Sequence, residues 1–253
     1  MSTTKPRILL IHGSAADHST WSIQVASKLG EELREHFTLI AYDRRRELTT
    51  VEEHADDAIA HLGPGFEIDE TPVLVCGSSF GAVVALDAVR RYASRFAGAV
   101  LLEPPMAPTD TVAPEQRELL VEFDRRRDEQ GDEAAAELFL RAVLGDAAYE
   151  RMPKAYQDRS KSMSAQIRAD SAALVAYRPR YAELADVRTP VLLVGGERSA
   201  AYFRPTLDAL LAALPNARLE ILAGAGHMMH AEAHKKFGEL LIAFGRDTGL
   251  LVR

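Results

Sequence analysis

The segment Gly77-Ser78-Ser79-Phe80-Gly81 decides the fold of this 253-residue chain. It directly follows the apolar run Val73–Cys76, and a stretch with helical spacing comes after it. A strand, a sharp turn and a helix in this order form a nucleophile elbow, whose central residue is held in a strained conformation. The two glycines let neighbouring backbone approach without a Cβ clash. The pattern predicts that Ser79 is an exposed nucleophile and that the N–H of Phe80 faces a developing oxyanion.

Outward from this segment, short apolar runs alternate with stretches of helical spacing. Continuous apolar runs suit parallel strands that are covered on both faces. The alternation predicts an α/β fold with an open, doubly wound, mostly parallel sheet of about six strands. Ligands bind such sheets beyond the carboxyl ends of the strands. The predicted strands are Ile8–Ile11, Phe37–Tyr42, Val73–Cys76, Ala99–Leu102, Val191–Val194 and Leu219–Leu222.

The alternation breaks once, between Pro104 and about Thr189, where amphipathic helices replace strands. We therefore expect an α/β core of residues 1–103 and 189–253 with a helical cap of residues 104–188 inserted into it. Apolar cap residues are candidates for a pocket wall, an interpretation that competes with simple helix packing. The predicted cap helices are Pro114–Glu129, Asp132–Leu144, Ala148–Arg159 and Met163–Tyr177.

Two loops at the same edge of the predicted sheet complete a candidate site. A serine nucleophile needs a base with a pKa near neutrality, and His227 in Gly224-Ala225-Gly226-His227 follows the last predicted strand. His12-Gly13-Ser14 closes the first strand, where the backbone N–H of Ser14 can become a second oxyanion donor. His12 itself is expected to support this loop. A plain glycine turn is the alternative interpretation of the segment.

Together these motifs resemble the α/β-hydrolase fold superfamily, and the resemblance covers nearly the whole chain. The His-Gly loop, the Gly-x-Ser-x-Gly elbow and the late Gly-His occur in the family's order. The resemblance implies a nucleophile, an acid and a histidine in that order, with an oxyanion hole and a helical cap over the pocket. It also implies that Trp21, where many members carry an aromatic residue, lies at the pocket. The antiparallel strands with which the family usually begins are not expected.

The chain departs from the family at the acid of the triad. The family usually places an aspartate after the strand Val191–Val194, whereas Ser199 stands at that position here. Glu103 ends the preceding strand and resembles the acid of those members that place it there. Neighbouring strands lie about 4.8 Å apart, and the extra methylene of a glutamate covers part of the added reach. Glu103 is the preferred acid, Glu197 is the alternative, and a site without an acid remains open. Asp43, which also ends a strand and which the resemblance makes a turn-stabilising residue, is a distant third candidate.

Composition argues against several other function classes. The chain carries 30 Lys and Arg against 37 Asp and Glu, and its net charge of -7 opposes a nucleic-acid partner. The N-terminal apolar run, Ile8–Ile11, is too short for a signal peptide or a membrane span. The single cysteine, Cys76, forms no internal disulfide, so we expect a cytoplasmic protein.

No cofactor or metal is implied by the motifs. No Gly-x-Gly-x-x-Gly follows a strand, and no Gly-Lys-Ser/Thr occurs, so dinucleotide and phosphate-loop sites lack their parts. His227, His230 and His234 are spaced for one helix face, but a metal there would compete with the role of His227, and no His-Glu-x-x-His is present.

The sequence thus predicts a serine hydrolase that cleaves a small, apolar carboxylic ester or lactone through an acyl-enzyme. The partner is a small-molecule substrate, and the chain is a monomer or a homodimer. Alternatives are a thioesterase, a lyase, an acyl-transfer enzyme, a cofactor-free oxygenase, or a ligand-binding receptor with a slow site. The predicted substrate-pocket residues are Trp21, Phe139, Met152, Tyr156 and Met163.

Overall fold

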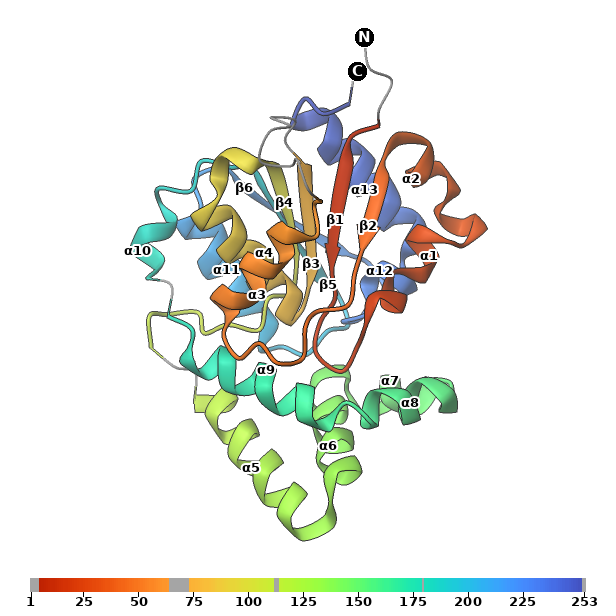
Figure 1. The fold of residues 1–253 in the computed structure, drawn as a ribbon, viewed down its shortest axis with the longest axis vertical. Coiled ribbons are helices and arrows are strands. Elements are labelled where there is room, and N and C mark those ends of the chain that lie inside the picture. Colours follow the sequence, from red (N-terminus) through yellow and green to blue (C-terminus); the bar gives the residue numbers. More distant parts are fainter. Residues whose placement is uncertain (1–4, 64–72, 112–113, 179, 252–253) are drawn as a thin grey trace.

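The computed structural model describes residues 5–63, 73–111, 114–178 and 180–251 (Figure 1). Within them, six strands form one sheet in the order β2-β1-β3-β4-β5-β6, and every neighbouring pair is parallel. Each predicted strand is present, so the predicted doubly wound sheet is confirmed. The strands are β1 (Arg7–Ile11), β2 (Thr38–Ala41), β3 (Val73–Ser78), β4 (Phe96–Leu102), β5 (Val191–Gly196) and β6 (Ala217–Leu222).

Helices cover both faces of the sheet, and β1 shows how its residues are divided between them. Leu9 and Ile11 pack on one face with α3, α4 and α11, while Ile8 and Leu10 pack on the other with α1, α2 and α13. This division follows from the two-residue period of a strand, and it explains why the strand is continuously apolar. The helices of the core are α1 (Ser22–Val25), α2 (Glu31–His36), α3 (Val51–Ala60), α4 (Phe80–Arg91), α11 (Phe203–Ala213), α12 (Met229–Glu232) and α13 (His234–Asp247), with short 3-10 turns at His18–Trp21, Lys28–Gly30 and Ala93–Arg95.

Beyond the carboxyl ends of the strands lies a layer of helices from the predicted insertion (Figure 1). Phe123, Leu140 and Ile167 form its own small apolar core, together with Ala135 and Ala136. One more helix of the insertion, α10 (Tyr181–Leu184), packs beside α11 instead. The helices of the layer are α5 (Pro114–Gln130), α6 (Asp132–Leu144), α7 (Asp146–Arg151), α8 (Lys154–Lys161) and α9 (Ser164–Ala176).

One expectation about the cap is wrong. Ala148–Arg159 is two helices, because α7 ends at Arg151 and α8 begins at Lys154. Pro153 is the cause: proline lacks an N–H and disfavours helical backbone at the residue before it. Met152 accordingly has extended backbone, with φ -63° and ψ 136°. The break turns α8 so that it runs beside the pocket described below.

The longest helix among the described residues is α5, with 17 residues and many charged side chains. Within the same part of the chain, no helix has both the length and the apolarity that crossing a bilayer requires.

Candidate active site

Ser79 lies at the sharp turn between β3 and α4. Its backbone has φ 54° and ψ -122°, a conformation that residues other than glycine rarely adopt. Its N–H donates to the carbonyl oxygen of Leu102 at 2.8 Å, which ties the turn to the end of β4. Such strain persists only where the surrounding structure fixes it, and it is concentrated at functional sites.

The two glycines of the turn are required by close backbone contacts. A Cβ atom on Gly77 would lie 2.0 Å from the carbonyl oxygen of Gly81, and one on Gly81 would lie 2.3 Å from that of Ile11. Neither contact is tolerable, because real Cβ atoms do not approach backbone within 3.0 Å. The motif therefore reflects packing between the elbow and β1.

Glu103 and His227 form a buried pair beside this turn. The Glu103 Oε2 atom lies 2.6 Å from His227 Nδ1, and its Oε1 accepts the N–H of Gly196 at 2.8 Å. Only 1% of Glu103 and 7% of His227 is exposed. A carboxylate only accepts hydrogen bonds, so Nδ1 carries the proton and Nε2 is left with its lone pair. The pair has the chemistry of a base held in one tautomer.

Phe203 contacts the other side of this imidazole. Its ring stacks on that of His227 with the centroids 4.5 Å apart and the planes 10° from parallel. The helix α11 thus fixes the ring orientation that the carboxylate alone leaves free. The sequence contained no signal for this role, because Phe203 falls on the apolar period of a helix and reads as an ordinary core residue.

The alternative acid, Glu197, lies elsewhere. Its side chain is exposed, and its Oε2 accepts the N–H of Gly224 at 2.7 Å. Ser199, at the position where the family usually has an aspartate, has a buried hydroxyl with no hydrogen-bond partner among the described residues. The structure thus brings Glu103 to the histidine and leaves Glu197 at a turn.

The His12-Gly13-Ser14 loop lies directly against Ser79. A Cβ on Gly13 would be 3.0 Å from the Cβ of Ser79. His12 Nε2 accepts the N–H of Arg44 at 3.1 Å, so its Nδ1 carries the proton that reaches the Gly13 carbonyl oxygen at 2.8 Å. Burial, and then the Arg44 charge, lower the pKa of His12 to about 3. His12 is therefore a neutral support of the loop.

The two predicted oxyanion donors flank Ser79. Phe80 is the first residue of α4, and the first N–H groups of a helix have no acceptor inside it. Ser14 follows the glycine that contacts Ser79, and its hydroxyl donates to Asp170 of α9 at 2.7 Å. Its side chain is thereby bound to the cap.

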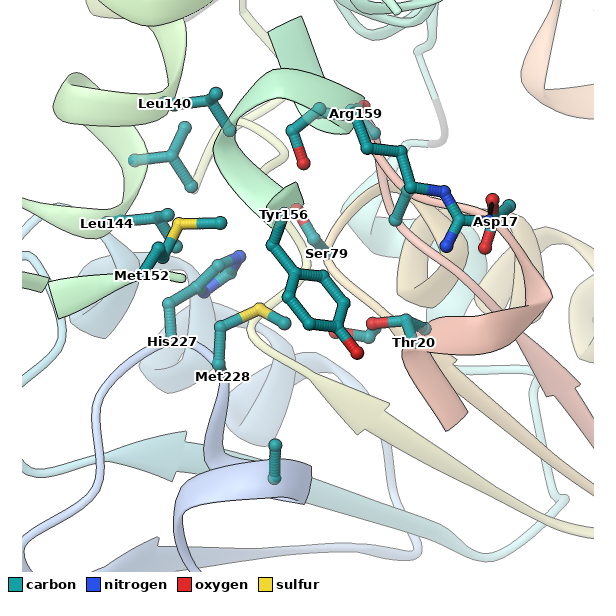
Figure 2. A pocket seen from close by; sticks show the side chains of 18 of the residues that line it. Asp17, Thr20, Ser79, Leu140, Leu144, Met152, Tyr156, Arg159, His227 and Met228 are labelled. Carbon is teal, nitrogen blue, oxygen red and sulfur yellow. Dashed lines mark hydrogen bonds and ion pairs between the residues drawn. The ribbon is translucent and has the colours of Figure 1, made fainter. Parts of the chain in front are cut away.

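A pocket with two lobes meets these residues, and Figure 2 shows the small lobe. The small lobe, of about 250 Å³, is lined by Ser79 and His227 together with Tyr156 of α8 (Figure 2). The large lobe has about 640 Å³ and also reaches Ser79. The lobes share Ser14, Ser79, Phe139 and Val143. Four of the five predicted pocket residues line the small lobe, namely Phe139, Met152, Tyr156 and Met163.

The sequence as a whole matches the model of the Alpha/beta hydrolase family over residues 8–240. The chain belongs to this family. Among solved structures, it is similar to an esterase from Thermogutta terrifontis, with 23% identity and a TM-score of 0.77, covering 97% of this chain and 91% of the other. An enol-lactonase from Burkholderia xenovorans LB400 has 23% identity and a TM-score of 0.76, covering 95% and 91%. MenH from S. aureus has 17% identity and a TM-score of 0.76, covering 98% and 96%. The search among curated proteins finds no match.

In this alpha/beta hydrolase Trp21 does not line the pocket, contrary to expectation. The indole is fully buried in the core, 4.7 Å from the ring of His230 and 6.3 Å from that of Phe237. Its neighbours Thr20 and Ser22 line the small lobe instead. A large aromatic side chain after the His-Gly loop gains more from burial against α13 than from a place on the pocket wall.

The late histidines of the chain do not gather around one point. His227 faces Glu103, His230 is buried with its Nε2 3.3 Å from the Thr20 hydroxyl, and His234 lies 3.4 Å from the Ala231 carbonyl oxygen. They have separate hydrogen-bond partners, which does not suit a shared metal.

Another part of the described chain does have metal-ligating atoms close together. Asp17, His18 and Asp43 each place one such atom within 4.8 Å of the others. These groups already bond to protein: His18 donates to Asp43 from its backbone at 2.8 Å, and Asp17 pairs with Arg159 of α8. Acidic groups at the surface that already have such protein partners do not by themselves indicate a metal centre.

Proposed function

We propose that this hydrolase cleaves a small, uncharged, largely apolar carboxylic ester or lactone through an acyl-enzyme on Ser79. The observation that carries the proposal is the buried Glu103–His227 pair, 2.6 Å from oxygen to nitrogen, opening on the pocket in which the strained Ser79 lies. A nucleophile, a base and a group that orients the base are the parts that acyl transfer through a serine needs.

In the first half-reaction the Ser79 hydroxyl oxygen attacks the ester carbonyl carbon while His227 Nε2 accepts its proton. The Glu103 carboxylate holds the Nδ1–H and stabilises the imidazolium that forms. The backbone N–H groups of Ser14 and Phe80 bind the oxygen on which negative charge develops. The tetrahedral intermediate then expels the alcohol, which takes the proton back from His227.

In the second half-reaction water attacks the acyl group on Ser79, and His227 is again the base. The acid leaves and Ser79 regains its proton. In a lactone the alcohol stays joined to the acyl group, so the product is a single hydroxy acid. The geometry at Ser79 is the same for both substrates.

The pocket supports the substrate class. Cap residues such as Leu140, Val143 and Leu144 give the small lobe a mainly apolar wall. The large lobe is also mainly apolar, but α5 adds three carboxylates to its lining, from Glu115, Glu118 and Glu122. Together with the net charge of -7, these groups disfavour anionic substrates. Because the lobes meet at Ser79, one takes the acyl group and the other the alcohol group.

The test is acid release from a panel of short esters, lactones and thioesters, with Ser79→Ala, Glu103→Ala and Glu197→Ala beside the wild type. We expect uncharged esters or lactones to be cleaved, Ser79 and Glu103 to be required, and Glu197 to be dispensable. A wild type that cleaves nothing, while Ser79 still reacts with a serine-directed phosphonate, would refute the hydrolase and favour a lyase or a receptor. The fold neighbours include an esterase and an enol-lactonase, and both activities fall within the proposed class.

A further inference from the structure

A fully buried ion pair joins the core of the molecule to the cap. Arg44 follows β2, and Asp170 lies on α9. Their contacts are bidentate, with Nη1 donating to Oδ1 at 3.0 Å and Nη2 to Oδ2 at 2.6 Å. The side chains are 1% and 2% exposed. Removing two charges from water costs about as much as their attraction returns, so such a pair is weak evidence for stability and invites another explanation.

That explanation lies in what else the pair contacts. Arg44 Nη2 also donates to the carbonyl oxygen of Gly13 at 3.2 Å, and its guanidinium carbon lies 4.5 Å from the centre of the Phe80 ring. The Asp170 Oδ2 atom accepts the Ser14 hydroxyl at 2.7 Å. The pair thus touches both residues proposed to donate to the oxyanion, and the glycine that precedes one of them.

Two neutral histidines hold Arg44 in place, and neither of them supplies a negative charge for it. His12 Nε2 accepts the backbone N–H of Arg44, and His54 Nε2 lies 3.3 Å from Arg44 Nη1. Burial, and then the Arg44 charge, lower the pKa of His54 to about 4, so the imidazole is neutral at pH 7. Asp170 is therefore the group that neutralises Arg44, and it comes from the cap.

We propose that Arg44 and Asp170 are positioning residues. They hold the oxyanion loop, residues 12–15, and make its geometry depend on how the cap packs against the core. This inference rests on the proposed function. When α9 packs on the core, Asp170 fixes Ser14 directly and Gly13 through Arg44, so the Ser14 N–H is held toward Ser79. Another ion pair between cap and core, Arg159–Asp17, is more exposed, with 44% and 16% exposed side chains, and it borders the small lobe.

The proposal separates effects on kcat from effects on KM. Neither Arg44 nor Asp170 lines either lobe, so their side chains do not contact a substrate bound there. Displacing a preorganised donor by about 1 Å costs on the order of 100-fold in rate. Loss of the pair should therefore lower kcat and leave KM nearly unchanged.

The decisive variant is the double substitution Arg44→Met/Asp170→Val. Replacing a buried ion pair by apolar side chains of similar size is often neutral for stability, whereas a single substitution leaves one charge buried alone. We expect a folded protein with a thermal midpoint near that of the wild type, kcat lower by about 100-fold, and KM within about threefold. A folded double variant with kcat within threefold of the wild type would overturn the proposal.

A second variant removes only the carboxylate charge, and a matched control tests the helix that carries it; both are compared only as folded proteins. Asp170→Asn keeps the side-chain size, and we expect kcat to fall by about 10-fold, because one charge-assisted bond to Arg44 is lost. The control is Arg168→Gln on the same helix. This substitution breaks the exposed ion pair with Asp124, at 2.8 Å, and leaves the Arg44–Asp170 pair intact. Its kcat should equal that of the wild type. Equal kcat for Asp170→Asn and Arg168→Gln would contradict a positioning role.

The rate at which a fluorophosphonate labels Ser79 makes the test independent of ester turnover. Attack on phosphorus also develops negative charge on an oxygen held by the same N–H groups. If the wild type cleaves no ester but the double variant is labelled about 100-fold more slowly, the proposed function fails and the positioning pair stands. Equal labelling rates in the folded variants would refute the pair whatever the substrate is.

Discussion

Replacing Glu103 by Gln tests the chemistry of the site most directly, because the side-chain size is kept and only the charge is removed. In the wild type, Oε1 accepts the N–H of Gly196 and Oε2 faces Nδ1 of His227. The glutamine oxygen must take the place of Oε1, since that neighbour is a donor. The amide nitrogen then faces Nδ1 and donates to it, so the imidazole proton moves to Nε2.

This tautomer is wrong for catalysis, because Nε2 no longer has the lone pair that accepts the Ser79 proton. We expect kcat to fall roughly 10⁴-fold, which corresponds to about 5.4 kcal/mol of lost transition-state stabilisation. The matched control is Glu197→Gln, whose exposed carboxylate bonds only to the N–H of Gly224 among the described residues. Its kcat should stay within about threefold of the wild type.

The assay is steady-state release of a chromogenic alcohol from the best ester of the panel, with circular dichroism to show that both variants are folded. The role of Glu103 as the acid is refuted if folded Glu103→Gln keeps more than a tenth of the wild-type kcat. It is refuted equally if Glu197→Gln loses as much as Glu103→Gln, because the acid would then be on the other strand.

Three further results are expected from the structure. Ser79→Gly should abolish turnover yet raise the unfolding free energy by about 1 kcal/mol in calorimetry, because glycine relieves the strain at φ 54°; a lower melting temperature would contradict this. Gly81→Ala should destabilise by about 3 kcal/mol or more in urea unfolding, because its Cβ would lie 2.3 Å from a β1 carbonyl oxygen, and wild-type stability would show that the elbow can shift. The folded-state pKa values of His12, His54 and His230 are about 3, 4 and 4, whereas the unfolded value is 6.5. The unfolded chain therefore binds more protons as the pH falls. The stability that these neutral histidines contribute is present above pH 6.5 and decreases below it. We expect a loss of up to about 4 kcal/mol between pH 6 and pH 5 in urea unfolding, and a constant free energy over this range would refute the assignment.

The sheet could be predicted because its signals are local. Each strand is a short apolar run whose pattern follows from burial on both faces, and the elbow motif follows from contacts within a few residues of Ser79 and with β1. The parallel sheet then brings the carboxyl ends of its strands to one edge, so Glu103 and His227 meet although they are 124 residues apart. Knowledge of the fold thus supplied a contact that the sequence pattern alone does not show.

Other contacts could not be predicted, because nothing local marks them. Arg44 and Asp170 are 126 residues apart, and each reads as an ordinary surface charge until the packing of α9 on the core buries both. Phe203 reads as a core residue for the same reason, and the burial of Trp21 depends on how α13 packs. Pro153 is different, because its missing N–H was a visible sign that the helix would break there.

Backbone strain connects these parts of the site. Among the described residues other than glycine, positive φ occurs at Ala15 (56°), Ser79 (54°) and Glu103 (43°), which lie just after β1, β3 and β4. Each belongs to one component: the oxyanion loop, the proposed nucleophile and its acid. Such residues cost about 1–3 kcal/mol each, so together they take a large share of a typical stability of about 5–15 kcal/mol. The surrounding fold must supply that energy, and contacts such as the Leu102 bond to Ser79 and the Val194 bond to Glu103 show where it does so, through the neighbouring strands of the sheet. The strain thus gives a physical reason why the site lies at the edge of a rigid parallel sheet, with the cap reaching it through side chains.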